Sequence, residues 1–379
     1  MDKKLFKSRK KLIVIIILLI LCIGAVIFTA NDYFLYDRTI AKVIEVSETL
    51  DSSSPALIGS TEDNYAQRLT AVIKNGDHKG EKITVINKYS SSLVTDEKYS
   101  EGDCLFIDLK TRSDGTLKAV CTGFKRDVYT VGVVALFIFA IVLVGGRKGA
   151  LSVMSVIFNM VIFYIAIELY FKGIDLFLLC CAAAVIFSAG SLSMVSGLNK
   201  KTAAAVISAL CGTTVTIIIA YIVLKITGGS GVRFDQMQYL IRPYEVIFIS
   251  ELLIGGLGAI MDISITMSSS MSELIDKDSS ISFDSLKKSG VEIGKDIMGT
   301  MTNVLFFTYV CGCIPLIVLA MRNDTRFSDI MKNYLNLEIV RSFVGSIGIV
   351  ITIPIAIFIS SRLLKGKRND KQEEKRGDE

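Results

Sequence analysis

The feature that most constrains this chain is a series of about eight apolar runs, each long enough to cross the hydrocarbon core of a bilayer as a helix. They cover residues 12–30, 128–144, 151–171, 176–195, 202–224, 246–268, 297–320 and 339–363. The chain is 51% hydrophobic and 21% charged, with a mean hydropathy of +0.53. This composition is typical of a polytopic α-helical membrane protein and not of a soluble enzyme.

The order of the runs predicts four parts. Residues 1–30 are a basic N-terminal tail with a first transmembrane anchor. The apolar run is too long for a signal peptide and lacks a clear cleavage site, so we expect it to stay on the protein. Residues 31–127 are a soluble β domain, residues 128–363 a seven-helix membrane bundle, and residues 364–379 a charged tail. Lys and Arg concentrate in the two tails and favour the cytoplasmic side. We therefore expect a cell-membrane protein with both termini in the cytoplasm and residues 31–127 outside.

The soluble part alternates apolar and polar residues in five short segments, at 41–46, 69–73, 82–87, 104–109 and 119–124. Turn residues such as Asn75-Gly76 and Asp114-Gly115 separate them. The pattern predicts a small β-barrel of the OB or SH3-like kind, with the polar run 50–64 as a loop. Cys104 and Cys121 fall on neighbouring strands, either as a disulfide or as two core thiols. There is no basic face with stacking aromatic residues, so nucleic acid is not an expected partner.

The run 246–268 carries a polar stripe at helical spacing, which continues beyond its end. The stripe consists of Glu251, Gly255, Gly258, Asp262, Thr266, Ser269 and Glu273. Asp262 lies well inside the span, where an ionised carboxylate costs at least about 2.5–3.5 kcal/mol. Such a residue marks an ion, proton or substrate path, or else forms a structural pair or a neutral hydrogen bond with another helix.

The next span, the seventh, has a polar face of its own. Asp296, Gly299, Thr300 and Asn303 share one side of its inner half. Facing the stripe of the sixth span, they would form one polar seam between two helices. Apolar residues at helical spacing between 283 and 297, with Ser282 as a cap, predict an amphipathic helix on the inner membrane surface that turns into this span. Arg341, near the outer end of the last span, would snorkel or pair with Glu338, with Glu251 and Glu168 as further candidates.

Several kinds of chemistry are not expected. The chain contains one histidine, His78, outside the spans. There is no phosphate-binding GxxxxGK[ST] motif and no intramembrane protease motif, so we expect neither an enzyme nor a cofactor. The sequence leaves open whether a metal ion binds.

Three segments carry a family resemblance: GLGAIMDISITMSSSMSEL around Asp262, SGVEIGKDIMGTMTNVLFFTY around Asn303, and EIVRSFVGSIGIVITIPI around Arg341. They resemble the signatures of the YibE/F family of bacterial multi-pass membrane proteins. The layout of an anchor, a small β domain and a helical bundle is also similar. The resemblance implies a plasma-membrane protein and places Asp262, Asp296, Gly299, Thr300, Met301 and Asn303 on family motif positions. It implies no substrate and no reaction.

Two functions fit this pattern. The first is a transporter or permease for an ion or small polar solute, whose site is the seam of Glu251, Asp262, Thr266, Ser269, Asp296, Thr300 and Asn303. The second is a non-transporting scaffold or sensor, whose outer β domain binds an envelope component or a partner protein. The lipid bilayer is a partner in both. A second copy of the chain or another membrane protein is a further candidate partner.

Overall fold

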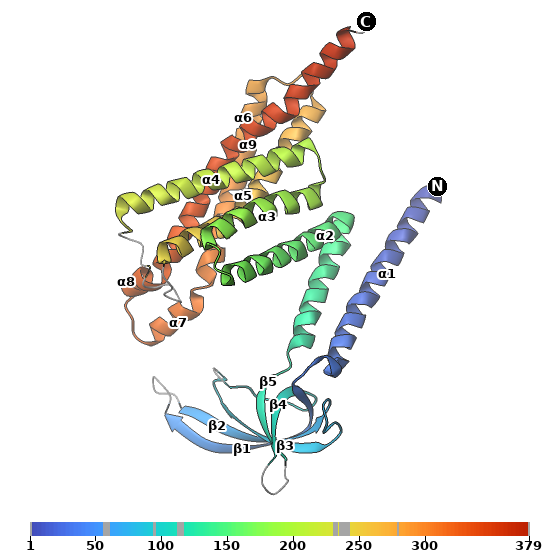
Figure 1. Cartoon of the computed structure of the whole chain (residues 1–379), viewed down its shortest axis with the longest axis vertical. Helices are drawn as coiled ribbons and strands as arrows, with labels where there is room; N and C mark the ends of the chain where they lie inside the picture. Colours follow the sequence, from blue (N-terminus) through green and yellow to red (C-terminus); the bar gives the residue numbers. More distant parts are fainter. Residues whose placement is uncertain are drawn as a thin grey trace. The chain divides into compact units, whose positions relative to one another are not determined.

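The computed structural model describes residues 2–55, 61–93, 96–111, 117–229, 234, 243–278 and 280–377. The chain forms two compact units, Met1–Val144 and Gly145–Glu379, and each is described by itself. In the first unit, helix α1 (Asp2–Asn31) and the short helix η1 (Tyr33–Leu35) lead into five strands. The start of helix α2 (Asp127–Phe171) follows the last strand (Figure 1).

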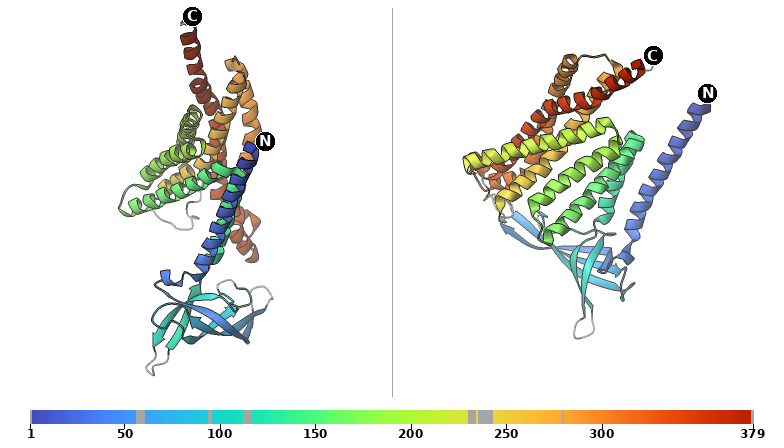
Figure 2. Two further views of the ribbon diagram at one scale, coloured as in Figure 1. Left: turned by 90° about the vertical axis from the view of Figure 1, so that its right-hand side faces the viewer. Right: turned by 45° about the horizontal axis from the view of Figure 1, so that its top comes forward.

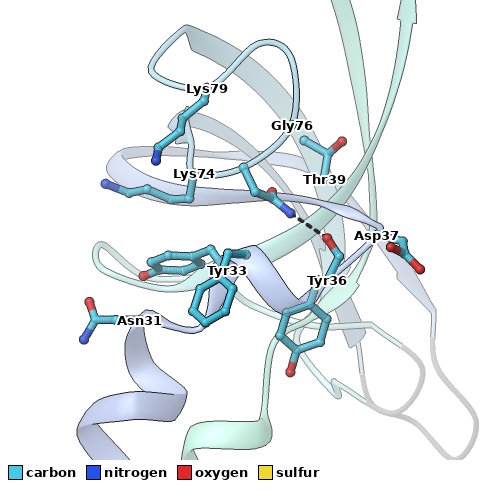
Figure 3. A pocket seen from close by; sticks show the side chains of 10 residues that line it. Asn31, Tyr33, Tyr36, Asp37, Thr39, Lys74, Gly76 and Lys79 are labelled. Carbon is cyan, nitrogen blue, oxygen red and sulfur yellow. Dashed lines mark hydrogen bonds between the residues drawn. The ribbon is translucent and has the colours of Figure 1, made fainter.

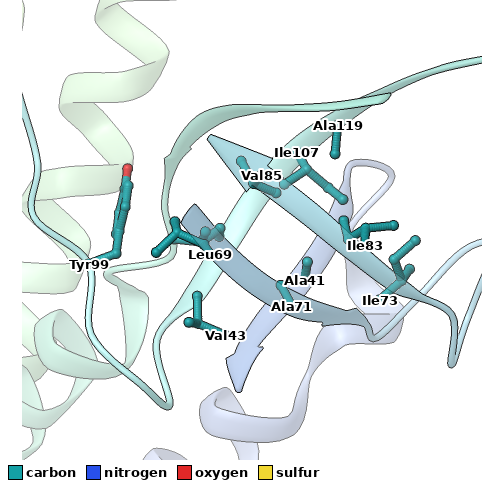
Figure 4. Close-up of a cluster of buried hydrophobic side chains, with 11 residues drawn as sticks. Ala41, Val43, Leu69, Ala71, Ile73, Ile83, Val85, Tyr99, Ile107 and Ala119 are labelled. Atoms are coloured by element: carbon teal, nitrogen blue, oxygen red, sulfur yellow. The ribbon is translucent and has the colours of Figure 1, made fainter. Parts of the chain in front are cut away.

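The strands form the predicted barrel. They are β1 (Thr39–Pro55), β2 (Thr61–Ile73), β3 (Lys82–Ser90), β4 (Cys104–Thr111) and β5 (Leu117–Phe124). They close in the order β1-β2-β3-β5-β4, with a parallel β3–β5 pair and antiparallel pairs elsewhere. This is a five-stranded Greek-key barrel of the OB kind. Apolar residues at alternating positions, among them Leu69, Val85 and Ile107, fill its interior (Figure 4).

One prediction for this unit is wrong. The polar run 50–64 is not a loop where the structure describes it, because β1 continues to Pro55 and pairs with β2 from Thr61 onward. The two strands form a long arm, in which Ser53 donates a hydrogen bond to Asp63 at 2.6 Å. The backbone ladder satisfies the polar groups of this arm, so no apolar face is needed to hold it. The turn predicted at Asp114-Gly115 lies outside the described residues.

The two cysteines of the barrel are free thiols. Cys121 Sγ donates to the hydroxyl of Tyr99 at 3.3 Å, and Cys104 Sγ lies 3.6 Å from the hydroxyl of Tyr33. Of the two alternatives, the structure shows two free thiols instead of a disulfide, and Cys121 packs against the barrel core.

A buried lysine joins the barrel to both helices of its unit. The side chain of Lys125, between β5 and α2, is 1% exposed and lies 2.8 Å from both Asp32 and Asp127. It also donates to the carbonyl oxygen of Thr29, in the last turn of α1, at 2.7 Å. Two rings, of Tyr33 and Tyr36, lie within cation–π distance. We call this group the Lys125 joint.

Helix α2 contains two of the predicted spans. Its 45 residues correspond to about 68 Å of helix, more than twice the thickness of the hydrocarbon core. Gly146 breaks it with a φ of 54° and a non-helical ψ, a conformation that favours glycine. Six helices of the described chain are long and apolar enough to cross a membrane, or seven if a bent pair counts as one span. Dividing α2 at Gly146 reconciles this number with the predicted eight.

The second unit is a bundle of helices around α5. It contains α3 (Leu176–Ser196), α4 (Lys200–Thr227), α5 (Tyr244–Lys277), α6 (Phe283–Cys311), α7 (Ile314–Arg322), α8 (Phe327–Ile330), a turn of π-helix labelled η3 (Met331–Leu335), and α9 (Asn336–Gly377). Helices α5, α6 and α9 run alongside one another, and α4 crosses α5 and α9 (Figures 1 and 2). Helices α6 and α7 are the bent pair, with an angle of 49° between them. The other predicted spans each lie within one of these helices.

Glycines allow these helices to approach α9 closely. A Cβ atom on Gly294 of α6 would lie 2.4 Å from the side chain of Ile353 of α9, and one on Gly212 of α4 would lie 2.1 Å from Thr352. From the α9 side, Gly345 receives Leu305 of α6. Small residues are the usual means of helix association in lipid, because packing replaces the hydrophobic driving force there.

The prediction of a surface helix at 283–297 is also wrong. Ser282 does cap the helix, by accepting a hydrogen bond from the backbone of Ser285. The helix then continues without a turn to Cys311 as α6. Its apolar positions Leu286 and Gly290 are buried against α9 and α5, so this face packs on the bundle instead of the membrane surface.

We predict opposite effects of alanine at two glycines of α6. Gly294→Ala should destabilise the protein by about 1–3 kcal/mol, because its methyl group collides with Ile353. Gly299→Ala should stabilise it by up to about 1 kcal/mol, because no atom lies within 4 Å and alanine favours helix. Thermal unfolding of the purified variants measures both. Equal shifts of the unfolding midpoint would contradict the packing described here.

The Lys125 joint should weaken in alkaline solution. The hydrogen bond from Tyr36 to Asp127 raises the pKa of Tyr36 to about 12. Burial acts to lower the pKa of Lys125, but the hydrogen bonds and charges of Asp127 and Asp32 outweigh it and raise that pKa. Both groups have a higher pKa in the folded state than the usual value of about 10. Their contribution to stability is therefore complete below about pH 10 and is lost as the pH rises through the folded-state values.

This pH dependence can be measured as the thermal unfolding midpoint of the full chain between pH 8 and pH 12. Tyr36→Phe should lower the midpoint at pH 8 and flatten its fall above pH 10, because phenylalanine has no proton to lose. A Tyr36→Phe protein with the same slope as the unmodified protein would show that this hydrogen bond does not hold the joint.

Candidate functional site

Three carboxylates lie on one face of α5 at even spacing. Glu251, Asp262 and Glu273 are eleven residues apart, about three helical turns or 16 Å each. With Gly255, Gly258, Thr266 and Ser269 between them, they make up what we call the α5 polar face. Asp262 lies in the middle, and the outer two lie about 33 Å apart, close to the thickness of a hydrocarbon core.

Asp262 is exposed on the surface of the bundle. Among the described residues Asp262 forms no hydrogen bond and no ion pair. The same holds there for Thr266 and Ser269, which are half-buried. Ser268 behaves differently, since it lies on the inner side of α5 and its hydroxyl forms a hydrogen bond with Ser360 of α9 at 3.0 Å. The stretch of the α5 polar face around Asp262 is therefore not the side with which the helix packs on α9.

The second predicted face lies on α6. Asp296, Thr300 and Asn303 are all exposed. Within the described chain, the Thr300 hydroxyl donates only to the backbone of its own helix, to the carbonyl oxygen of Ile297 at 2.8 Å. Gly299 has no neighbouring atom within 4 Å of the position of a Cβ. We call this the α6 polar face.

The structure does not join the two polar faces side chain to side chain. Within the described residues, no hydrogen bond or ion pair links Glu251, Asp262, Thr266 or Ser269 with Asp296, Thr300 or Asn303. The inner sides of both helices pack on α9 through Ile263, Met267, Leu286 and Leu305. At helical spacing Asp262 on α5 and Asn303 on α6 lie on sides that are turned away from these packing residues. Glu251, at the end of α5, is the exception, because it reaches Arg341 of α9.

The two helices meet at one point on the α5 polar face. The hydroxyl of Tyr309 of α6 lies so close to Gly255 that a Cβ there would be 2.1 Å from it. This hydroxyl is buried and has no hydrogen-bond partner among the residues that the structure describes. Any side chain at residue 255 would displace Tyr309, so glycine is required here for contact and not for backbone freedom.

An ion cluster lies at the end of the α5 polar face. Arg341 of α9 pairs with both Glu251 of α5 and Glu338 of its own helix. Arg341 is 13% exposed and Glu338 19%, whereas Glu251 is 43% exposed. The pair of Arg341 with Glu338, predicted from the sequence, is present, and so is the pair with the further candidate Glu251. Of the predicted site residues, Glu251 is the one held by a defined charge contact.

Sequence reasoning missed Tyr309 as part of this region. Tyr309 does not lie on the helical spacing of Asp296, Thr300 and Asn303. The one indirect indication was Gly255, because a glycine on a helix face can make room for a large side chain of a neighbouring helix. In the part of the chain that the structure describes, no group of three or more His, Cys, Asp or Glu residues could hold a metal ion.

Comparison with known proteins gives two matches along the chain. Residues 133–366 match the family model described as YibE/F-like protein. Residues 34–124 match the model described as YibE/F family N-terminal domain. No curated protein and no solved structure matches the chain. The first match contains both polar faces and the ion cluster, and the second contains the barrel.

We predict that Arg341→Gln destabilises the bundle by about 3 kcal/mol, because it leaves Glu338 largely buried without its partner. Adding Glu338→Gln should recover much of this loss, because the double variant has no unpaired charge at that position. Thermal unfolding of both variants tests the pair. Arg322→Gln, at the last residue of α7 and exposed, is the control and should change stability by less than about 0.5 kcal/mol. Additive losses in the double variant would contradict the coupling.

Proposed function

The chain belongs to the YibE/F family of membrane proteins, and we propose that it moves an ion or a small polar solute across the membrane along the α5 polar face. The observation that carries this proposal is Asp262, which lies in the middle of α5, is exposed on the bundle and has no partner among the described residues. A carboxylate at that depth does not face hydrocarbon without a large cost, so water, solute or protein must cover it.

The neighbouring groups suit a cation or a proton-coupled solute. Glu251 and Glu273 place further carboxylates toward the two ends of the same face. Thr266 and Ser269 offer hydroxyl oxygens, and Asp296, Thr300 and Asn303 of the α6 polar face lie on a neighbouring helix. In this proposal Asp262 binds the ion or proton. The hydroxyl and amide groups replace part of the hydration shell of the ion.

The orientation is part of the proposal. The basic residues of the N-terminal tail and of the C-terminal tail support placing both termini in the cytoplasm of a bacterial cell. The barrel would then lie outside the cell membrane. The solute would cross between the end of α5 that carries Glu251 and the end that carries Glu273.

The alternative, a scaffold or sensor, has one observation in its favour. The Lys125 joint ties the barrel to α1 and to the start of α2 within one unit, which is what transfer of a signal from a bound partner would require. In that case the α5 polar face would be covered by protein. The two functions differ in whether water reaches this face.

Cysteine labelling tests this directly. In a protein whose eight cysteines are replaced by serine, Gly258→Cys is placed one turn from Asp262, where a side chain meets no atom within 4 Å. A charged, water-soluble thiol reagent reacts with the thiolate and therefore needs water at the site. We expect Gly258→Cys to react at least about tenfold faster than Val304→Cys, a control at an exposed apolar position of α6.

A solute that occupies the path should protect Gly258→Cys from labelling. Protection is measured for Na⁺, K⁺, Mg²⁺, Mn²⁺ and a series of pH values, and Asp262→Asn should abolish it. Equal reaction rates at Gly258→Cys and Val304→Cys would mean that water does not reach the face. That result would end the transport proposal and favour the scaffold or sensor.

A further inference from the structure

A cavity of about 340 Å³ lies where α1 joins the barrel. Its lining comes from two segments that are far apart in the sequence: the end of α1 with the linker after it, and the turn after β2 (Figure 3). The lining residues are Asn31, Tyr33, Phe34, Tyr36, Asp37, Thr39, Lys74, Asn75, Gly76 and Lys79. All of them belong to the first unit, and neither the transport proposal nor the family matches assign them a role.

The wall of this cavity is rigid. Asn75 is buried and makes three hydrogen bonds: its Oδ1 accepts from the backbone of Ile40 at 2.6 Å, and its Nδ2 donates to the carbonyl oxygens of Tyr36 and Arg38. Lys74 donates its own N–H to Ile40 at 2.7 Å. Gly76 follows in the left-handed region, with a φ of 76°. The two lysines of this turn are therefore held on a fixed backbone.

The charge of the cavity is positive. Lys74 and Lys79 extend toward the same side of the cavity, whereas Asp37, the one carboxylate of the lining, lies at the opposite side (Figure 3). Neither lysine takes part in an ion pair among the described residues. The nearby Glu81 is paired with His78 at 3.2 Å, and neither Glu81 nor Asp77 belongs to the lining. Two ammonium groups without acid partners favour a strongly charged anion, and phosphate is one that lysine commonly binds.

The cavity also lies at the end of an apolar helix. The membrane-crossing stretch of α1 ends at Asn31, which is itself a lining residue. Phe34 and Leu35 follow a few residues after Asn31, and they are 73% and 60% exposed. Exposed aromatic and aliphatic side chains beside basic residues are typical of the lipid headgroup region.

From these four observations we propose that this cavity binds a phosphate-bearing anion, either the headgroup of an anionic phospholipid or a soluble phosphate compound. Lys74 and Lys79 neutralise its charge, and the wall built on Asn75 fixes their position. Phe34 and Leu35 contact the acyl or glycerol part when the ligand is a lipid.

The test uses the full chain in a neutral detergent. Phosphatidylglycerol and phosphatidylcholine are titrated separately, and bound lipids are counted by native mass spectrometry. Inorganic phosphate is added in a parallel arm, both as a competitor of the lipid and as a ligand in thermal unfolding. The variant Lys74→Gln with Lys79→Gln should bind phosphatidylglycerol roughly 30-fold more weakly than the unmodified protein.

The matched control is Lys88→Gln with Lys110→Gln. It removes the same charge from two exposed positions of the barrel outside the cavity, and it should bind like the unmodified protein. Lys79→Gln alone, at an exposed side chain, keeps the test valid if the double variant does not fold, and should still weaken binding several-fold.

The two sources of phosphate are separated by the competition arm. A lipid site keeps phosphatidylglycerol in the presence of inorganic phosphate, whereas a site for soluble phosphate releases the lipid and gains thermal stability from phosphate alone. Unchanged binding of both ligands after Lys74→Gln with Lys79→Gln would overturn the proposal. Equal weakening in the control would also overturn it, because it would show general charge attraction to the barrel.

Discussion

The contact on which the bundle depends is the close approach of α4, α5 and α6 to α9. In lipid, helices gain little from hiding apolar surface, so they associate where their backbones can come near enough for dense packing. Here glycines provide that approach from both sides: Gly212 and Gly294 bring α4 and α6 onto α9, and Gly345 of α9 receives Leu305. The face that each helix packs against α9 decides which of its side chains are buried and which are exposed.

That packing decides what remains on the outside. Because α5 and α6 turn their small and apolar residues toward α9, the residues between those positions are left at the surface of the bundle. On most membrane helices such a surface is apolar and meets lipid. On α5 it carries Asp262 and on α6 it carries Asn303, so the outward sides of these two helices are unsuited to hydrocarbon. The ion cluster of Arg341 with Glu251 and Glu338 compensates the charges at one end, whereas Asp262 has no such partner in the part of the chain that the structure describes.

Much of this fold could be predicted because its signals are local. The apolar runs, the alternation in the barrel strands and the cap at Ser282 each need only neighbouring residues to be recognised, and the structure confirms them. The arm formed by residues 50–55 and 61–64 was missed because a ladder between two polar strands has no apolar signature. The course of α6 was missed because its amphipathic face fits a membrane surface as well as another helix. The contact of Tyr309 with Gly255 depends on how two helices pack, which no spacing within one helix reveals.

The Lys125 joint has a consequence for the order in which the chain is made. The closing strand β5 ends at Phe124 and α2 begins at Asp127, so the last strand of the barrel and the next span leave the ribosome almost together. Until then β3 and β4 lack the neighbour that joins them, and Asp32 lacks the lysine that neutralises it. Completion of the barrel therefore coincides with membrane insertion of the second helix: a chain stalled before residue 117 would display an open sheet edge and an unpaired acid beside its anchor.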